Sequence, residues 1–199
     1  NTGGGLGLTL DGQNMVARVW DEGAVRRTHN GFGGRVTTID DSGSTYNNHS
    51  THVAGTIIAN RWSVGSNAIK GMATQASART FNWTDDESEA LSEVALGMLL
   101  SNHSYGVPVT GTGGTLPSWY IGSYVEDSRA WDEIAYISPY YLPVYSAGND
   151  GTNNNNPDPI AAGYDKLVGN KVAKNVLTIA NAQDATIATD GSLTSVSID

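Results

Sequence analysis

Residues 49–56 read His-Ser-Thr-His-Val-Ala-Gly-Thr, and two isoleucines follow them. An almost uncharged run of small and apolar residues predicts a buried helix, which we place over 49–61 with His49 in its first turn, facing a cleft. The apolar run 15–20 is followed by Asp21 and predicts a buried strand with a carboxylate at its carboxyl end. Because open α/β proteins bind ligands at the carboxyl ends of their strands, Asp21 and His49 are candidate site residues.

Outward from this stretch, short apolar runs alternate with helix-like segments. Strands are expected near 14–20, 35–39, 77–82, 98–102, 142–147 and 175–180, and helices near 49–61, 87–97 and 124–137. Short buried strands separated by amphipathic helices predict an α/β fold, in which a mainly parallel sheet is covered by helices on both faces. The glycine-rich residues 111–115 lack the lysine of a phosphate-binding loop and are interpreted as a surface insertion.

The charge balance narrows the range of partners. The 199 residues include 20 acidic and 11 basic side chains, for a formal charge of −9. Nucleic acids and anionic membrane surfaces attract cationic proteins, so neither is an expected partner. There is no cysteine, hence no disulfide and no thiolate metal site. No apolar run approaches the roughly 18 residues of a membrane span.

A third segment follows the apolar residues near 142–147 and reads Ser146-Ala147-Gly148-Asn149-Asp150-Gly151. Taken in chain order, Asp21, the helix start at His49 and this segment resemble the subtilisin-like serine proteases, whose triad runs Asp, His, Ser. The family's helix start reads His-Gly-Thr-His-Val-Ala-Gly-Thr, and only Ser50 departs from it. The resemblance implies a subtilisin-like fold and a serine endopeptidase that acts on protein or peptide substrates.

The resemblance also assigns roles to individual residues. Asp21 would orient His49, His49 would act as general base, and Asn149 would donate its side-chain amide to the oxyanion hole. The segment Ser104-Tyr105-Gly106 is similar to the family's edge strand, which pairs with an extended substrate. Asp150 would lie at the rim of the pocket for the residue before the scissile bond, where a carboxylate attracts lysine or arginine. The alternative is that Asp150 only forms a turn.

A metal-binding interpretation of the two histidines is weaker. His49 and His52 share one helix face, but zinc hydrolases space two histidines by four residues with a glutamate base, and neither feature is present. We therefore predict no metal ligand in this segment. The cofactor is unknown from the sequence, and calcium stays open at residues 153–158, whose amide and carboxylate oxygens lack the acid spacing of a known calcium loop.

The nucleophile is the missing element. The family carries its serine in a Gly-Thr-Ser-Met-Ala segment that opens a helix, and Ser192, Ser195 and Ser197 match neither the motif nor the helix. We therefore expect residues 1–199 to be the amino-terminal two thirds of a single peptidase domain, processed or trimmed. Alone it would be inactive, and a companion chain would carry the serine.

An incomplete domain also leads to an expectation about its surface. The last predicted strand should expose apolar side chains, namely Val176, Leu177 and Ile179. Secretion is expected from the class of hydrolase. The alternative function is a non-catalytic binding or adhesion module that retains the same fold.

Overall fold

The computed structural model describes residues 10–40, 45–60, 62–64, 67–111, 114–150, 166–183 and 185–197. The chain forms two compact units, Asn1–Ser104 and Tyr105–Asp199. Asp21 and His49 belong to the first unit, and Asn149 belongs to the second.

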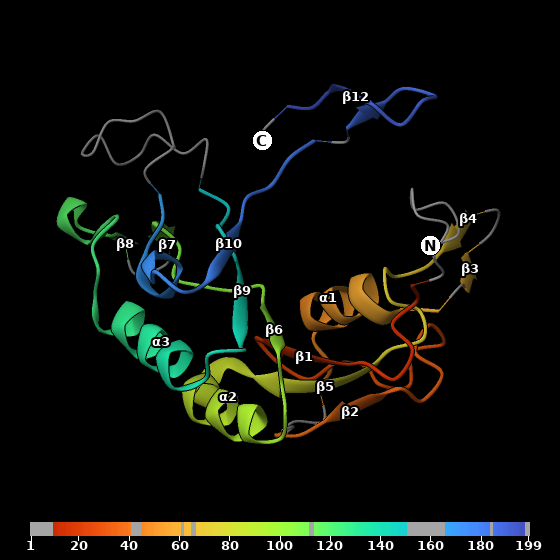
Figure 1. Ribbon diagram of the computed structural model, residues 1–199, viewed down its shortest axis with the longest axis horizontal. Coiled ribbons are helices and arrows are strands. Elements are labelled where there is room, and N and C mark those ends of the chain that lie inside the picture. The colour runs from red at the N-terminus through yellow and green to blue at the C-terminus, as the bar shows by residue number, and fades with distance from the viewer. Residues whose placement is uncertain are drawn as a thin grey trace. The chain divides into compact units, whose positions relative to one another are not determined.

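The first unit is built on four parallel strands with the order β6-β1-β5-β2 (Figure 1). The strands are β1 (Val16–Asp21), β2 (Val36–Thr38), β5 (Ser77–Asn82) and β6 (Leu100–His103). The register places Asp21 beside Asn82 and Trp20 beside His103, so these carboxyl-terminal strand ends meet at one edge. Asp21, the last residue of β1, therefore lies at the edge where parallel α/β sheets bind ligands.

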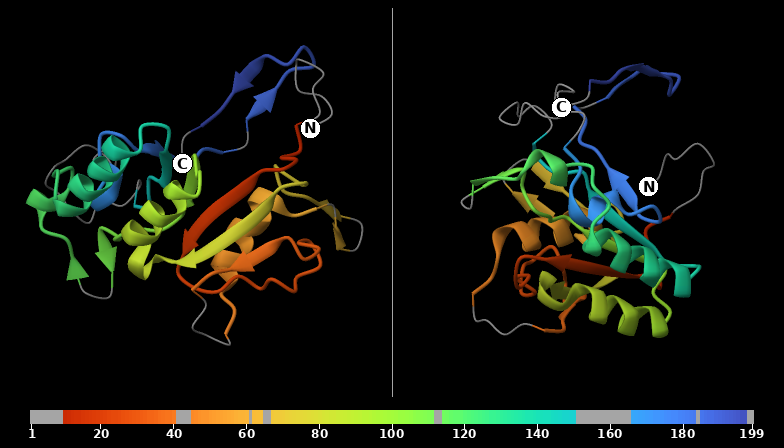
Figure 2. Two further views of the ribbon diagram at one scale, coloured as in Figure 1. Left: turned by 60° about the horizontal axis from the view of Figure 1, so that its bottom comes forward. Right: turned by 90° about the vertical axis from the view of Figure 1, so that its left-hand side faces the viewer.

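Two helices cover opposite faces of these strands, as both figures of the whole chain show (Figures 1 and 2). They are α1 (Asn48–Ile58) and α2 (Asp86–Ala95). Successive side chains of a strand point to opposite faces, and Ala17 packs in the core cluster that includes Ala54 and Ile58 of α1. Asp21 has the same parity as Ala17, so the strand itself directs the carboxylate toward α1.

The opposite face of β1 contacts α2 through aromatic and charged side chains. Trp20 stacks on Phe81 at 4.3 Å between ring centroids, and its Nε1 donates to Glu89 at 2.9 Å. Glu93 accepts from Arg79 Nη2 at 2.6 Å and from Arg18 Nε at 3.1 Å. Burial opposes the charged form of Glu93, but the hydrogen bonds from the two arginines outweigh burial and lower the pKa of Glu93.

A close backbone approach at Gly71 fixes the end of α1. The N–H groups of Gly71, Met72 and Ala73 donate to the carbonyls of Ala59, Thr56 and Ile57 at 2.7–3.0 Å, and so cap the helix end. A Cβ on Gly71 would lie 2.6 Å from the Gly55 carbonyl oxygen and 2.7 Å from the Ala59 nitrogen. Only a residue without a side chain fits between these backbone atoms.

We therefore expect Gly71→Ala to lower the free energy of unfolding by about 2–3 kcal/mol, since the added methyl group overlaps backbone that cannot move aside. Urea denaturation of the intact protein measures the change. Gly55→Ala is the matched control, because no atom of the described residues, apart from the neighbouring backbone of the helix itself, lies within 4 Å of a Cβ at Gly55, and alanine favours the helix. Equal stability of the two variants would contradict the close contact.

His103 is a buried histidine that belongs to the packing of β6. Its ring is 0% exposed, stacks on Trp20 at 5.2 Å, and its Nε2 lies 2.7 Å from Ser101 Oγ. Burial lowers the pKa of His103 from 6.5 to about 3. The folded protein therefore keeps this ring neutral at pH values where the unfolded chain binds a proton.

This difference predicts that stability falls on acidification. Below pH 6.5 the unfolded state binds more protons, so His103 should cost about 1.4 kcal/mol of unfolding free energy per pH unit, down to the folded pKa. Denaturation between pH 7 and pH 5 measures the slope above the range where most carboxylates titrate. His103→Phe should flatten the curve and the exposed-site control His52→Phe should not; parallel curves for both variants would show that another group is responsible.

The second unit pairs two parallel strands, β9 (Leu142–Ser146) and β10 (Leu177–Ile179), and holds the helix α3 (Glu126–Ile137). Trp131 of α3 packs edge-on against Tyr145 of β9 at 5.4 Å. A smaller core gathers Val109, Ile121 and Val168. None of the helices in the described part of the chain is long and apolar enough to cross a membrane.

Short elements complete both units. Among the described residues, three antiparallel hairpins are formed by β3 (Trp62–Val64) with β4 (Asn67–Ile69), β7 (Thr110–Gly111) with β8 (Gly114–Thr115), and β11 (Thr186–Ile187) with β12 (Leu193–Ser195). The 3₁₀ turns are η1 (Trp83–Asp85), η2 (Ser118–Tyr120) and η3 (Gly169–Val172).

The predicted α/β class with mainly parallel strands is confirmed, and each predicted long element is present within a few residues of its expected bounds. The hairpins were not predicted, and part of the supposed surface insertion at 111–115 belongs to the β7–β8 hairpin. Leu177 and Ile179 are exposed as predicted, at 44% and 49%, whereas Val176 is half-buried.

Candidate active site

Asp21 ends β1 with its side chain buried, 2% exposed. Its Oδ1 accepts three hydrogen bonds: from the Glu22 backbone N–H at 2.8 Å, from Ser50 Oγ at 3.2 Å and from the ring of His49 at 2.7 Å. Oδ2 is also buried and has no hydrogen-bond partner in the described structure. The donors around Oδ1 stabilise a carboxylate in a place that water does not reach.

His49 stands in the first turn of α1, and the predicted hydrogen bond to Asp21 is present. The bond joins His49 Nδ1 to Asp21 Oδ1, while the imidazole side chain is 49% exposed. A carboxylate only accepts, so Nδ1 carries the hydrogen and Nε2 of the neutral ring keeps its lone pair. The pair therefore presents a proton acceptor at Nε2, on a ring that is half open to solvent.

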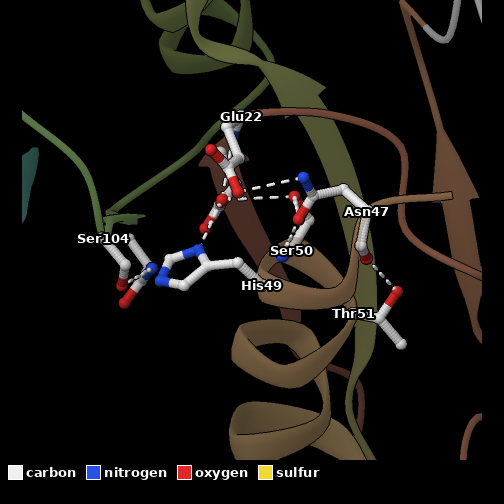
Figure 3. A network of polar contacts seen from close by, with 8 residues as sticks. Glu22, Asn47, His49, Ser50, Thr51 and Ser104 are labelled. Atoms are coloured by element: carbon white, nitrogen blue, oxygen red, sulfur yellow. Dashed lines mark hydrogen bonds and ion pairs between the residues drawn. The ribbon is translucent and has the colours of Figure 1, made fainter. Parts of the chain in front are cut away.

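Asn47 ties the strand end to the helix start. It is the N-cap of α1, where its Oδ1 accepts from the Ser50 N–H at 3.0 Å, and its Nδ2 donates to Glu22 Oε1 at 2.9 Å. Its backbone N–H donates to the Ala24 carbonyl at 2.8 Å. Figure 3 shows Asn47, His49 and Ser50 grouped at the start of α1 beside Glu22. Asn47 thus holds the two elements in the positions that the Asp21–His49 bond requires.

Ser50, the position that departs from the family's glycine, joins this network. Its hydroxyl is fully buried and lies 3.2 Å from Asp21 Oδ1 and 3.3 Å from Asn47 Oδ1. The helix begins normally at Asn48 despite the added side chain. Sequence reasoning noted Ser50 only as a departure from the family's motif and missed it as a hydrogen-bond partner. A hydroxyl next to the candidate base was the available signal.

Asp21, Glu22 and His49 also form a group whose ligand atoms lie within 4.8 Å of one another, a geometry that a cation can use. In the structure His49 Nδ1 is engaged with Asp21 and Glu22 Oε1 with Asn47. Acidic groups of this kind are common at protein surfaces, so the cluster alone does not indicate a metal. His52 is exposed and is not a member of the group. The residues 153–158, left open for calcium, lie outside the described residues.

In the second unit, Asn149 follows β9 and is exposed, and Asp150 is half-buried. Asp150 Oδ2 accepts from the Val109 N–H at 2.9 Å. This internal contact favours the alternative in which Asp150 holds a turn, and its role in substrate binding stays a prediction. The convergence of Asn149 with Asp21 and His49 also stays a prediction, because the two units are described separately.

The proposed substrate segment begins at the end of β6. Ser104 Oγ accepts from Asn102 Nδ2 at 2.9 Å in the first unit. Tyr105 packs edge-on against Tyr145 at 6.1 Å in the second unit, and Gly106 is exposed. No strand is assigned to 104–106, which are all described, so the expected edge strand is an irregular segment here.

A buried carboxylate that orients a half-exposed histidine, at the carboxyl edge of parallel strands, is the acid–base arrangement of serine hydrolases with an α/β fold. The sequence pattern of the Subtilase family matches residues 25–199, across both units, and the chain belongs to that family. The match begins after Asp21, so the family pattern does not test the orienting role of Asp21, which stays a prediction.

Solved structures show the same fold. The chain is similar to MycP1 with the N-terminal propeptide removed, at 16% identity and a TM-score of 0.52 over 95% of this chain and 62% of that one. It is also similar to the MycP3 protease from the type VII (ESX-3) secretion system, at 15% identity and a TM-score of 0.50 over 90% and 56%. No curated protein sequence matches the chain. The chain spans about half the length of the first solved structures that it matches, at 50% and 52%.

Proposed function

We propose that this chain supplies the acid–base part of a serine endopeptidase that hydrolyses peptide bonds in proteins. The observation that carries the proposal is the hydrogen bond between His49 Nδ1 and the buried Asp21 Oδ1. It fixes the tautomer in which Nε2 takes a proton, and the carboxylate then stabilises the imidazolium that forms. Family membership supports the same chemistry.

The reaction needs two further groups. A serine hydroxyl would transfer its proton to His49 Nε2 as it attacks the peptide carbonyl, and the amide of Asn149 would donate to the oxyanion of the tetrahedral intermediate. Residues 1–199 contain no match to the family's nucleophile segment, so we place the serine on a polypeptide segment outside them, as a companion to this chain. The exposed Leu177 and Ile179 are apolar surface that such a segment could cover.

Substrate would bind as an extended chain along Ser104-Tyr105-Gly106. Asp150, which directly follows Asn149 in the sequence, would lie at the rim of the pocket for the residue before the scissile bond. The excess of acidic residues disfavours nucleic acid as a partner. A secreted location fits the class of enzyme. If the parent protein lacks the serine, the remaining candidate is a binding or adhesion module with this fold.

Labelling with a fluorophosphonate tests the proposal, because the probe reacts only with a serine that a base has activated. The intact parent protein should form one covalent adduct, and mass spectrometry should map it to a serine outside residues 1–199. Residues 1–199 alone should neither react nor cleave peptides. An adduct on a serine within 1–199 would contradict our placement of the nucleophile, and no adduct on the intact protein would favour the binding module.

A further inference from the structure

Lys171 in η3 is a buried cation in the second unit. Lys171 is only 5% exposed, although lysine is among the residues least often buried. Burial, the larger influence, lowers the pKa of Lys171, and the charge of Asp150 opposes this effect. A lysine held in this way needs either an ion-pair partner or a ligand to offset its loss of water.

The ammonium lies against two glycines, Gly106 of the proposed substrate segment and Gly148 directly before Asn149. A Cβ on Gly106 would be 2.6 Å from Lys171 Nζ, and a Cβ on Gly148 would be 3.1 Å from it. Gly106 and Gly148 are themselves exposed. The absence of side chains at both positions therefore provides the space in which the charged end of Lys171 lies, between the segment 104–106 and the turn before Asn149.

This charge has no ion-pair partner among the described residues. No salt bridge within 4.0 Å joins Lys171 to an acid in that part of the chain. The acid whose charge acts on it is Asp150, which forms no ion pair with Lys171 within 4.0 Å and whose Oδ2 accepts from the Val109 N–H at 2.9 Å. The ammonium is consequently able to form a charge-assisted hydrogen bond with an incoming anion.

We propose that Lys171 binds the carboxylate of a substrate glutamate or aspartate at the position immediately before the scissile bond. The proposal rests on the proposed function, because the resemblance to subtilisin-like proteases puts that substrate residue next to the turn at Asn149 and Asp150. It reverses the preference for lysine or arginine inferred from Asp150 alone. The reason is that the carboxylate of Asp150 has an internal donor, while the ammonium of Lys171 pairs with no acid in the described part of the chain.

The test uses the intact parent protein and two peptides that differ only in glutamate or glutamine before the scissile bond. Each is also prepared with a reduced, uncleavable peptide bond, so that binding is measured separately from hydrolysis. The glutamate peptide should be favoured about tenfold or more, in kcat/KM and in Kd, because a hydrogen bond to a charged group discriminates by at least that factor. Lys171→Met should reduce the ratio to about one, and Lys171→Arg should keep most of it.

Lys174→Met is the matched control, since Lys174 is an exposed lysine of the same unit, 4.6 Å above the Tyr124 ring, and its removal should leave the ratio unchanged. If circular dichroism shows that Lys171→Met does not fold, the glutamate-to-glutamine ratios of the wild type and of Lys171→Arg test the proposal instead. Equal cleavage of both peptides by the wild type overturns the proposal and leaves the protease standing. An equal loss of kcat/KM on both peptides in Lys171→Met also overturns the proposal. If the protein binds the glutamate peptide more tightly, depends on Lys171 for this, and cleaves neither peptide, the anion site is supported and the proposed protease function is contradicted.

Discussion

His49→Ala is expected to lower kcat of the intact parent protein by about 10⁶, and Asp21→Asn by about 10⁴, which are the losses that equivalent changes produce in serine proteases with the same triad. Alanine removes the base. Asparagine keeps the shape of Asp21 but removes the charge that stabilises the imidazolium, and its amide can donate to Nδ1 and so favour the wrong tautomer. Steady-state hydrolysis of a fluorogenic peptide measures both effects.

The double variant separates this mechanism from simple damage to the fold. Because Asp21 acts through His49, adding Asp21→Asn to His49→Ala should cost little more than His49→Ala alone. His52→Ala, on the exposed side of the same helix, is the control and should stay within about threefold of wild type. Additive losses in the double variant would mean that the two residues do not work as one unit.

Asn149→Leu is expected to lower kcat by about 10²–10³ with little change in KM, which is the loss known for removing an oxyanion donor in a member of this family. Leucine keeps the branched shape of asparagine but cannot donate to the oxyanion, which exists only in the tetrahedral intermediate. The split between kcat and KM is therefore the informative readout.

A peptide boronate, which mimics the tetrahedral intermediate, gives a second measurement for Asn149. Its affinity should fall in Asn149→Leu by about the same factor as kcat, whereas an uncleavable substrate analogue should bind almost as before. A fall in affinity for both ligands alike would instead indicate that Asn149 supports the loop after β9.

Local sequence pattern was sufficient for the longer helices and strands, and the family resemblance predicted the hydrogen bond between Asp21 and His49. The run 77–82 became β5 with the predicted bounds, and the uncharged run after His49 became the helix α1. Such elements depend on hydrophobic periodicity, which is a property of neighbouring residues. The hairpins escaped prediction because two- and three-residue strands leave too few alternations to recognise.

The sequence by itself therefore determined the α/β class, the family, and the likeness of Asp21, His49 and Asn149 to catalytic residues. Only the tertiary structure decided that Ser50 donates to Asp21, that Asn47 links the strand end to the helix start, and that the charge of Lys171 lies against Gly106 and Gly148. These contacts join residues whose partners are set by packing and burial. The sequence position of a hydroxyl, an amide or an ammonium group does not indicate which partner the group will contact once folding has excluded water.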